Sequence, residues 1–121
     1  MTLPTPRPFK EMPLCESTTS IATTPVGAAM IAPRAGIIER VMAAAGGTTT
    51  GTIAIAVAVN GGSDITGGNL TIPAGTGARA ASVYELGATS GTPVNEGDLI
   101  MFTPSGGTGA SIPGAFTAII R

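Results

Sequence analysis

The chain has 121 residues and a net charge of −1, with 11% charged residues, 3% aromatic residues and no histidine. This composition excludes Ser/His/Asp and Cys/His catalytic sites and zinc sites built from Cys and His. It also lacks the basic excess with which proteins bind nucleic acid. The size fits one domain, and 18 glycines and 10 prolines predict short strands and turns.

The first 33 residues differ in composition from the rest of the chain. Four of the first 13 residues are proline, and a run rich in Ser and Thr follows, which favours an extended backbone. Composition alone also fits a disordered tail. We predict an extended arm over residues 1–33, which lies along another chain or adds a strand to a sheet edge. Its predicted partner-binding residues are Leu3, Phe9, Met12, Leu14, Ile21 and Val26.

Two segments follow the arm before the first long alternating pattern. Residues 28–31 are apolar and end before Pro33. Residues 37–45 fit either a short helix, closed by the glycines at 46 and 47, or a strand with a β-bulge at Glu39 and Arg40. We predict the strand, because neighbouring segments are strands and an isolated short helix is marginal.

Residues 48–62 contain the clearest strand pattern in the chain. Between positions 53 and 59, β-branched residues alternate with alanines, so an extended chain places Ile and Val on one face and Ala on the other. The alanine face fits two interpretations: close packing of one sheet on the next, or a flat surface for another subunit or the arm. The run is too short to span a membrane.

The remaining strands are predicted at residues 70–72, 80–86, 99–103 and 115–120, with residues 93–98 as a turn. Seven or eight short strands at this spacing predict an all-β domain over residues 34–121, an antiparallel β-sandwich or jelly roll. Because aromatic residues are scarce, we expect this small domain to bind a partner or copies of itself.

The residues that could carry chemistry have simpler structural interpretations. The single cysteine, Cys15, rules out an internal disulfide. Glu96 and Asp98 flank a glycine in the predicted turn, and turn formation explains them better than catalysis. Asp64 lies in a Gly-rich loop that lacks the repeated acidic ligands of a calcium site. The sequence therefore predicts no enzyme, no cofactor and no metal.

From about Pro33 to the end of the chain, turn-and-strand segments follow one another in a recognisable order: A-P-R-A-G-I-I-E-R-V, G-G-T-T-T-G-T-I-A-I-A-V-A-V-N-G, G-G-N-L-T-I-P-A, V-N-E-G-D-L-I, P-S-G-G and I-P-G-A-F-T-A-I-I. Their order and spacing resemble those of small head decoration, or cement, proteins of tailed bacteriophages. In the match, Gly36, Gly61, Gly97 and Asp98 fall on turn positions of that family.

The resemblance implies a β-sandwich on the outer capsid surface of a virion, made in the host cytoplasm. Its implied partners are the major capsid protein and itself, as a dimer or trimer on a local symmetry axis, with neither nucleic acid nor membrane bound. Such a protein stabilises contacts between capsid subunits. The alternative hypothesis is a carbohydrate- or receptor-binding β-sandwich of a phage tail or cell surface, which needs exposed aromatic residues for sugar stacking.

Overall fold

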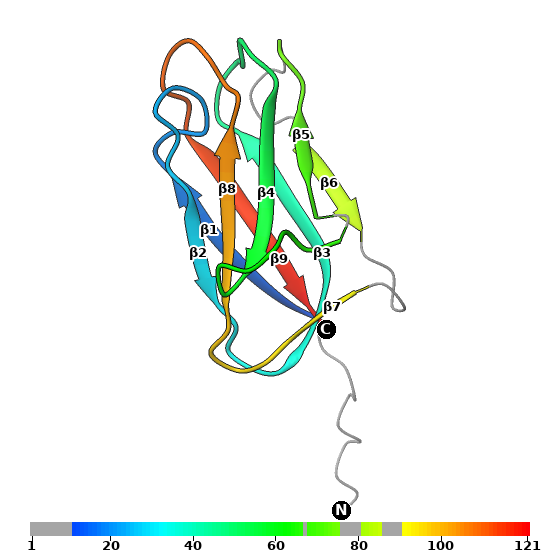
Figure 1. Ribbon diagram of the computed structural model, residues 1–121. Coiled ribbons are helices and arrows are strands. Elements are labelled where there is room, and N and C mark those ends of the chain that lie inside the picture. The colour runs from blue at the N-terminus through cyan, green and yellow to red at the C-terminus, as the bar shows by residue number, and fades with distance from the viewer. Residues whose placement is uncertain (1–10, 67, 76–80, 86–90) are drawn as a thin grey trace, which may run out of the picture.

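The computed structural model describes residues 11–66, 68–75, 81–85 and 91–121. These residues form nine β-strands, joined by turns and loops: β1 (Met12–Thr18), β2 (Ala28–Ile31), β3 (Gly36–Ala45), β4 (Ile53–Val59), β5 (Leu70–Ile72), β6 (Ala81–Glu85), β7 (Thr92–Val94), β8 (Leu99–Ser105) and β9 (Gly114–Ile120) (Figure 1). Across these four ranges, no helix has the length and apolar character needed to cross a membrane.

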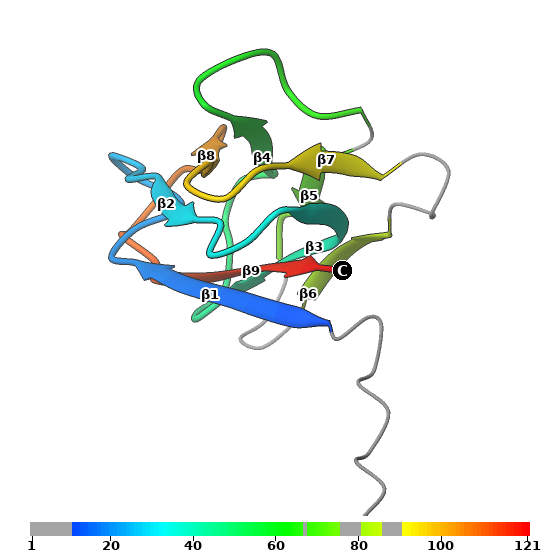
Figure 2. The same ribbon diagram turned by 90° about the horizontal axis from the view of Figure 1, so that it is seen from below.

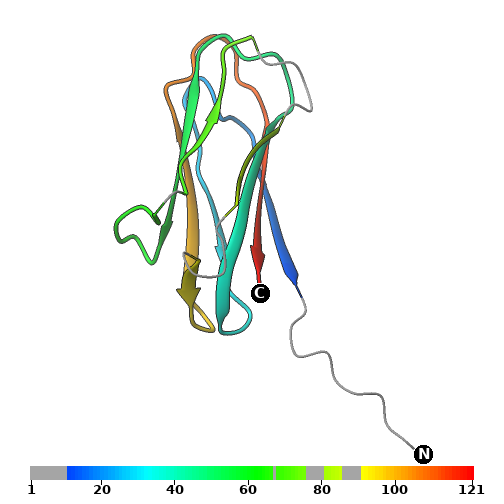
Figure 3. The same ribbon diagram turned by 90° about the vertical axis from the view of Figure 1, so that its right-hand side faces the viewer.

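The strands form two sheets that face each other. Sheet A has the order β1-β9-β3-β6, and β7 also pairs with β3, whereas sheet B has the order β2-β8-β4-β5. Neighbouring strands within both sheets are antiparallel. Seen along the strands and from the side, the two sheets are stacked layers (Figures 2 and 3). The predicted all-β antiparallel sandwich is confirmed.

β3 is the segment that the sequence left open between helix and strand. It forms a ten-residue strand, and its register with β9 shifts between Ile38 and Arg40. A β-bulge of this kind lets two residues that are an odd number of positions apart lie on the same face of a sheet. Ile38 and Val41 are therefore both directed into the core, where each is 0% exposed. The predicted strand and its bulge are confirmed.

The core lies between the inner faces of the two sheets. Ile53, Ile55 and Val57 of β4 are buried, as the alternating pattern predicts. At the centre, the rings of Phe102 in β8 and Phe116 in β9 stack across the two sheets with their centroids 5.0 Å apart. Two of the three phenylalanines thus bind the sheets together, although aromatic residues are rare in the chain.

The segment predicted to be an arm belongs largely to the sandwich. β1 pairs with β9 along its whole length, β2 is a strand of sheet B, and Ile21 between them is 0% exposed. The Ile21 N–H donates to the carbonyl of Ile112 at 2.8 Å. The boundary predicted at residue 33 is therefore wrong, because the core requires side chains from residues 12–32. Residues 1–10 lie outside the described residues.

β1 and β7 raise the number of described strands to nine, against the seven or eight predicted. β7 pairs with the first residues of β3, and its last two residues fall within the turn predicted over residues 93–98, so that turn begins later than predicted. Gly97 in that turn (φ 89°) and Gly61 after β4 (φ 71°) have positive φ, which glycine adopts without steric cost. Gly36, by contrast, is the first residue of β3 and not a turn residue.

Candidate interaction surfaces

The six predicted partner-binding residues do not form one surface. Leu3 and Phe9 lie outside the described residues. Met12 and Leu14 are half-buried in β1, and Leu14 packs against the core. Ile21 is completely buried within this chain, so it cannot contact a partner, and its prediction as a contact residue is wrong. Val26, 50% exposed in the loop between β1 and β2, is accessible.

The free edge of β1 is poorly suited to pairing with a further strand. The Ser17 N–H donates to the neighbouring Glu16 Oε1 at 3.1 Å and is thereby capped. Backbone N–H groups along a strand point alternately to its two edges, so the nitrogen of residue 13 points to the same edge as that of Ser17. Proline has no N–H, so Pro13 offers no donor there. At this edge of β1, the Cys15 N–H is left between two blocked positions. Proline and a charged side chain are common protections of an edge strand.

The strand addition that was predicted for the arm therefore occurs inside the chain. β1 completes sheet A by pairing with β9, with Met12 opposite Ile120 and Thr18 opposite Gly114. This pairing satisfies the backbone groups on one side of β1, and the capped edge faces away from β9. The free edge of β1 is therefore a poor docking site, and the faces and grooves of the sandwich are the surfaces considered next.

The alanine face of β4 points outward. Ala54 is exposed, and Ala56 and Ala58 are half-buried, whereas the β-branched residues of the same strand fill the core. Of the two interpretations of these alanines, close packing between the sheets is wrong. The alanines form a flat strip on the outside of sheet B.

Neighbouring strands extend this strip into a wider surface, which we call the sheet-B face. The register places Met101 of β8 between Ala29 of β2 and Ala58 of β4, and residues directly opposite one another share a face. Ile31, at the end of β2, is 65% exposed. The sheet-B face consists of Ala29, Ile31, Ala54, Ala56, Ala58, Met101 and Thr103. None of these seven residues is charged, and the exposed Asp64, which forms a β-bridge with Ala58, lies at the margin of the face.

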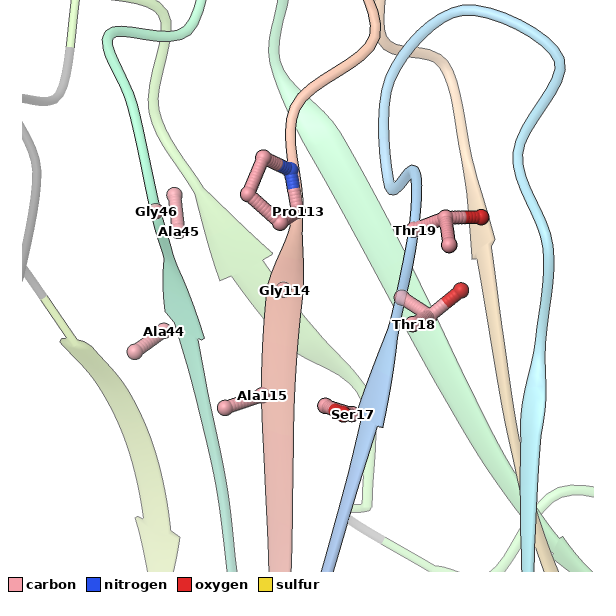
Figure 4. A pocket seen from close by; sticks show the side chains of 9 residues that line it. All are labelled: Ser17, Thr18, Thr19, Ala44, Ala45, Gly46, Pro113, Gly114 and Ala115. Carbon is pink, nitrogen blue, oxygen red and sulfur yellow. The ribbon is translucent and has the colours of Figure 1, made fainter.

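Sheet A has a shallow hollow on its upper part. It has a volume of about 480 Å³ and lies over the ends of β3, β9 and β1, which run side by side (Figure 4). Glycine and alanine dominate its floor because their side chains leave the space empty. It is lined by Ser17, Thr18, Thr19, Ala44, Ala45, Gly46, Pro113, Gly114 and Ala115. This set has no ionisable side chain, so the hollow has no group for acid–base chemistry.

A groove of about 390 Å³ separates the edge strands of the two sheets. Leu14 and Glu16 of β1 line one wall, and Met30 and Ile31 of β2 line the other. Leu14 is the one predicted contact residue that lines it. Ile31 was not predicted, although residues 28–31 are apolar at every position, which is a signal that both faces of this strand meet apolar surroundings.

Of the acidic residues in the loops near the end of β4, Asp98 holds the turn before β8 together. Asp98 accepts hydrogen bonds from the Asn95 N–H at 2.8 Å and from the Asn60 side-chain amide at 3.0 Å. The Asn95 N–H, followed by the Asn60 amide, lowers the pKa of Asp98. Glu96 and Asp64 are exposed loop residues. Within the part of the chain that the structure describes, no group of three or more Cys, Asp or Glu side chains could hold a metal ion.

No protein-family model matches this sequence, and no curated protein shows significant similarity to it. The candidate surfaces therefore rest on the geometry of the chain itself. They are the sheet-B face, the hollow on sheet A and the groove between β1 and β2.

Proposed function

We propose that the protein is a structural virion protein, a capsid decoration or cement protein that binds the outer surface of a phage head. It stabilises contacts between major capsid subunits. The observation that carries this proposal is the sheet-B face, whose seven residues are accessible to solvent and uncharged, with Asp64 at its margin. Exposed apolar surface of this kind is typical of protein-binding sites, and the cores of interfaces are depleted in charged residues and enriched in methionine.

The connectivity of the strands supports the same proposal. We infer a jelly roll formed by the eight strands other than β7, with β1-β9-β3-β6 in one sheet and β2-β8-β4-β5 in the other. Double-sheet jelly rolls occur in viral capsid and lectin domains. Because one fold serves many functions, the connectivity favours these two classes without choosing between them.

The aromatic residues favour the capsid protein over the carbohydrate-binding alternative. Sugar rings stack on exposed aromatic side chains, but Phe102 and Phe116 are stacked on each other in the core. The other two aromatic residues of the chain are Phe9, in the first ten residues, and Tyr84 of β6, whose side chain lies outside the described part. The described surface therefore offers no aromatic platform.

The proposed mechanism is mechanical and involves no catalysis. Copies of the protein dock on neighbouring major capsid subunits, and they associate as a dimer or trimer on a local symmetry axis. Each copy contributes a modest contact area, and repetition over the shell adds the contacts together. The result is a shell that resists the pressure of packaged DNA, while the protein itself contacts no DNA.

Heating of particles with and without the protein tests the proposal. Heads that carry the protein should release their DNA at a higher temperature than heads that lack it, and adding the purified chain back should restore the difference. Equal release temperatures would contradict a cementing role.

Two matched substitutions test which face docks. Ala56→Arg places a charge on the sheet-B face and should abolish binding to heads, whereas Ala44→Arg places the same charge on the outside of sheet A and should leave binding intact. Both alanines are half-buried and outward-facing, so their effects on folding are comparable. Loss of binding in Ala44→Arg alone would move the docking surface to sheet A.

A further inference from the structure

The turn that follows β4 is built on an Asn-Gly sequence. Asn60 (φ 55°) and Gly61 (φ 71°) both have positive φ, and the Gly62 N–H donates to the Val59 carbonyl at 3.0 Å. These are the features of a type I′ turn, in which Asn-Gly is strongly preferred. The same dipeptide is chemically reactive, because a glycine has no side chain to shield its backbone nitrogen from the preceding asparagine.

The Asn60 side chain is held by hydrogen bonds at both ends of its amide. Nδ2 donates to Asp98 Oδ1 at 3.0 Å, and Oδ1 accepts from the Leu99 N–H at 2.8 Å. The Asn60 backbone N–H also donates to the Leu99 carbonyl, at 2.7 Å. Asn60 is nevertheless exposed, so water reaches it freely. Hydrogen bonding, and not burial, fixes this amide.

We propose that Asn60 is a site of spontaneous covalent modification, its conversion to aspartate or isoaspartate, and that the hydrogen bonds it donates to Asp98 and accepts from the Leu99 N–H control the rate. This inference does not depend on the proposed function. The fold requires the reactive Asn60-Gly61 dipeptide for its turn, and the same fold slows the reaction of that dipeptide.

The reaction needs only water as a co-reactant. The Gly61 backbone nitrogen attacks Asn60 Cγ and gives up its proton to water, while the bond from Cγ to Nδ2 breaks and the amide nitrogen leaves as ammonia. Water then adds to one of the two carbonyls of the resulting five-membered succinimide and opens the ring. One opening gives aspartate, and the other gives isoaspartate. The net change is asparagine plus water to a carboxylic acid plus ammonia.

The restraint acts on both steps of ring formation. The side chain has to rotate to bring Cγ to the Gly61 nitrogen, and this rotation breaks the bonds to Asp98 and Leu99. The departing nitrogen is the same atom that donates to Asp98. After conversion to aspartate, a carboxylate stands where the amide donor stood, so the bond to Asp98 is lost and two negative charges face each other. Modification should therefore loosen the junction between β4 and β8.

The first test uses the wild-type chain without substitution. The purified protein is incubated at neutral pH, folded in buffer and unfolded in guanidinium chloride, and each asparagine-containing peptide is followed by mass spectrometry. Asn60 should convert about ten- to hundredfold more slowly in the folded chain, the factor that a hydrogen bond to a charged group supplies. Asn69 and Asn95, which precede Leu and Glu, are internal controls with little conversion in either state. Equal rates at Asn60 in the two states would overturn the proposal.

The second test removes the acceptor. Asp98→Ala should speed conversion at Asn60 about tenfold in the folded protein, whereas Glu96→Ala, which removes an exposed carboxylate from the same turn, should leave the rate unchanged. An unchanged rate in a folded Asp98→Ala variant would remove Asp98 from the mechanism. If that variant does not fold, the comparison of the folded and unfolded wild type still decides the proposal.

Discussion

Ile21→Ala tests whether the first third of the chain is part of the core. The Ile21 side chain is 0% exposed, and it packs so closely on β9 that a Cβ added at Gly114 would lie 2.4 Å from its Cγ2 atom. Truncating a buried isoleucine removes its transfer free energy and leaves a cavity, which together cost about 2–5 kcal/mol. A small domain has a free energy of unfolding of about 5–15 kcal/mol. The substitution therefore removes a large part of the total free energy of unfolding.

Val26→Ala is the matched control, because it removes methyl groups from the same segment at a position that is half exposed. Its effect should stay within about 0.5 kcal/mol. Thermal and urea unfolding of both variants give the free energies, and Ile21→Ala should melt about 10 °C or more below the wild type. If both variants were as stable as the wild type, residues 12–32 would be an appendage, and the sandwich would be complete without them.

Two further predictions concern packing and pH. Gly114→Ala should lower the free energy of unfolding by about 1–3 kcal/mol, because its Cβ overlaps Ile21, whereas Gly47→Ala meets its nearest neighbour at an ordinary 3.5 Å and should have a smaller effect in the same unfolding assay. The pKa of Asp98 is lowered in the folded chain, so its contribution to stability is complete above the unfolded pKa and is lost as the pH falls through the folded value. Urea titrations should show a steeper loss of stability below about pH 4 in the wild type than in Asp98→Asn; Glu96→Gln is the matched removal of a carboxylate. Identical slopes for the wild type and Asp98→Asn would contradict the stabilising role of the Asp98 carboxylate.

The strands with strong local patterns could be predicted from the sequence. The alternation of Ile and Val with Ala fixed β4 as a strand with two unlike faces, and the break in pattern at Glu39 and Arg40 located the bulge in β3. These features follow from neighbouring residues alone. They require no knowledge of the rest of the fold.

β1 could not be predicted in the same way. Its residues include Pro13 and a polar run, and its partner strand is about a hundred residues away: Cys15 lies against Thr117 across the sheet. A strand of this composition is stable because β9 and the core are already present. The sequence pattern of the segment itself therefore indicated an extended arm and placed Ile21 on the outside.

The direction of the alanine face was also beyond local reasoning. Alanine fits both a packed interior and an exposed sheet, so Ala54, Ala56 and Ala58 carry no preference of their own. Their outward direction follows from the opposite face of β4, whose Ile and Val residues have to be buried. The sheet-B face appears only when β2 and β8 are aligned beside β4.

The occupancy of phage heads by this protein tests the central claim most directly. Heads that lack the protein are mixed with increasing amounts of the purified chain, and bound copies are counted after sedimentation and located by electron cryomicroscopy. We predict saturable binding to the outer surface, with a fixed number of copies per head and density at local symmetry axes. Absence of the protein from sedimented heads, or binding that never saturates, would contradict its role as a capsid decoration protein.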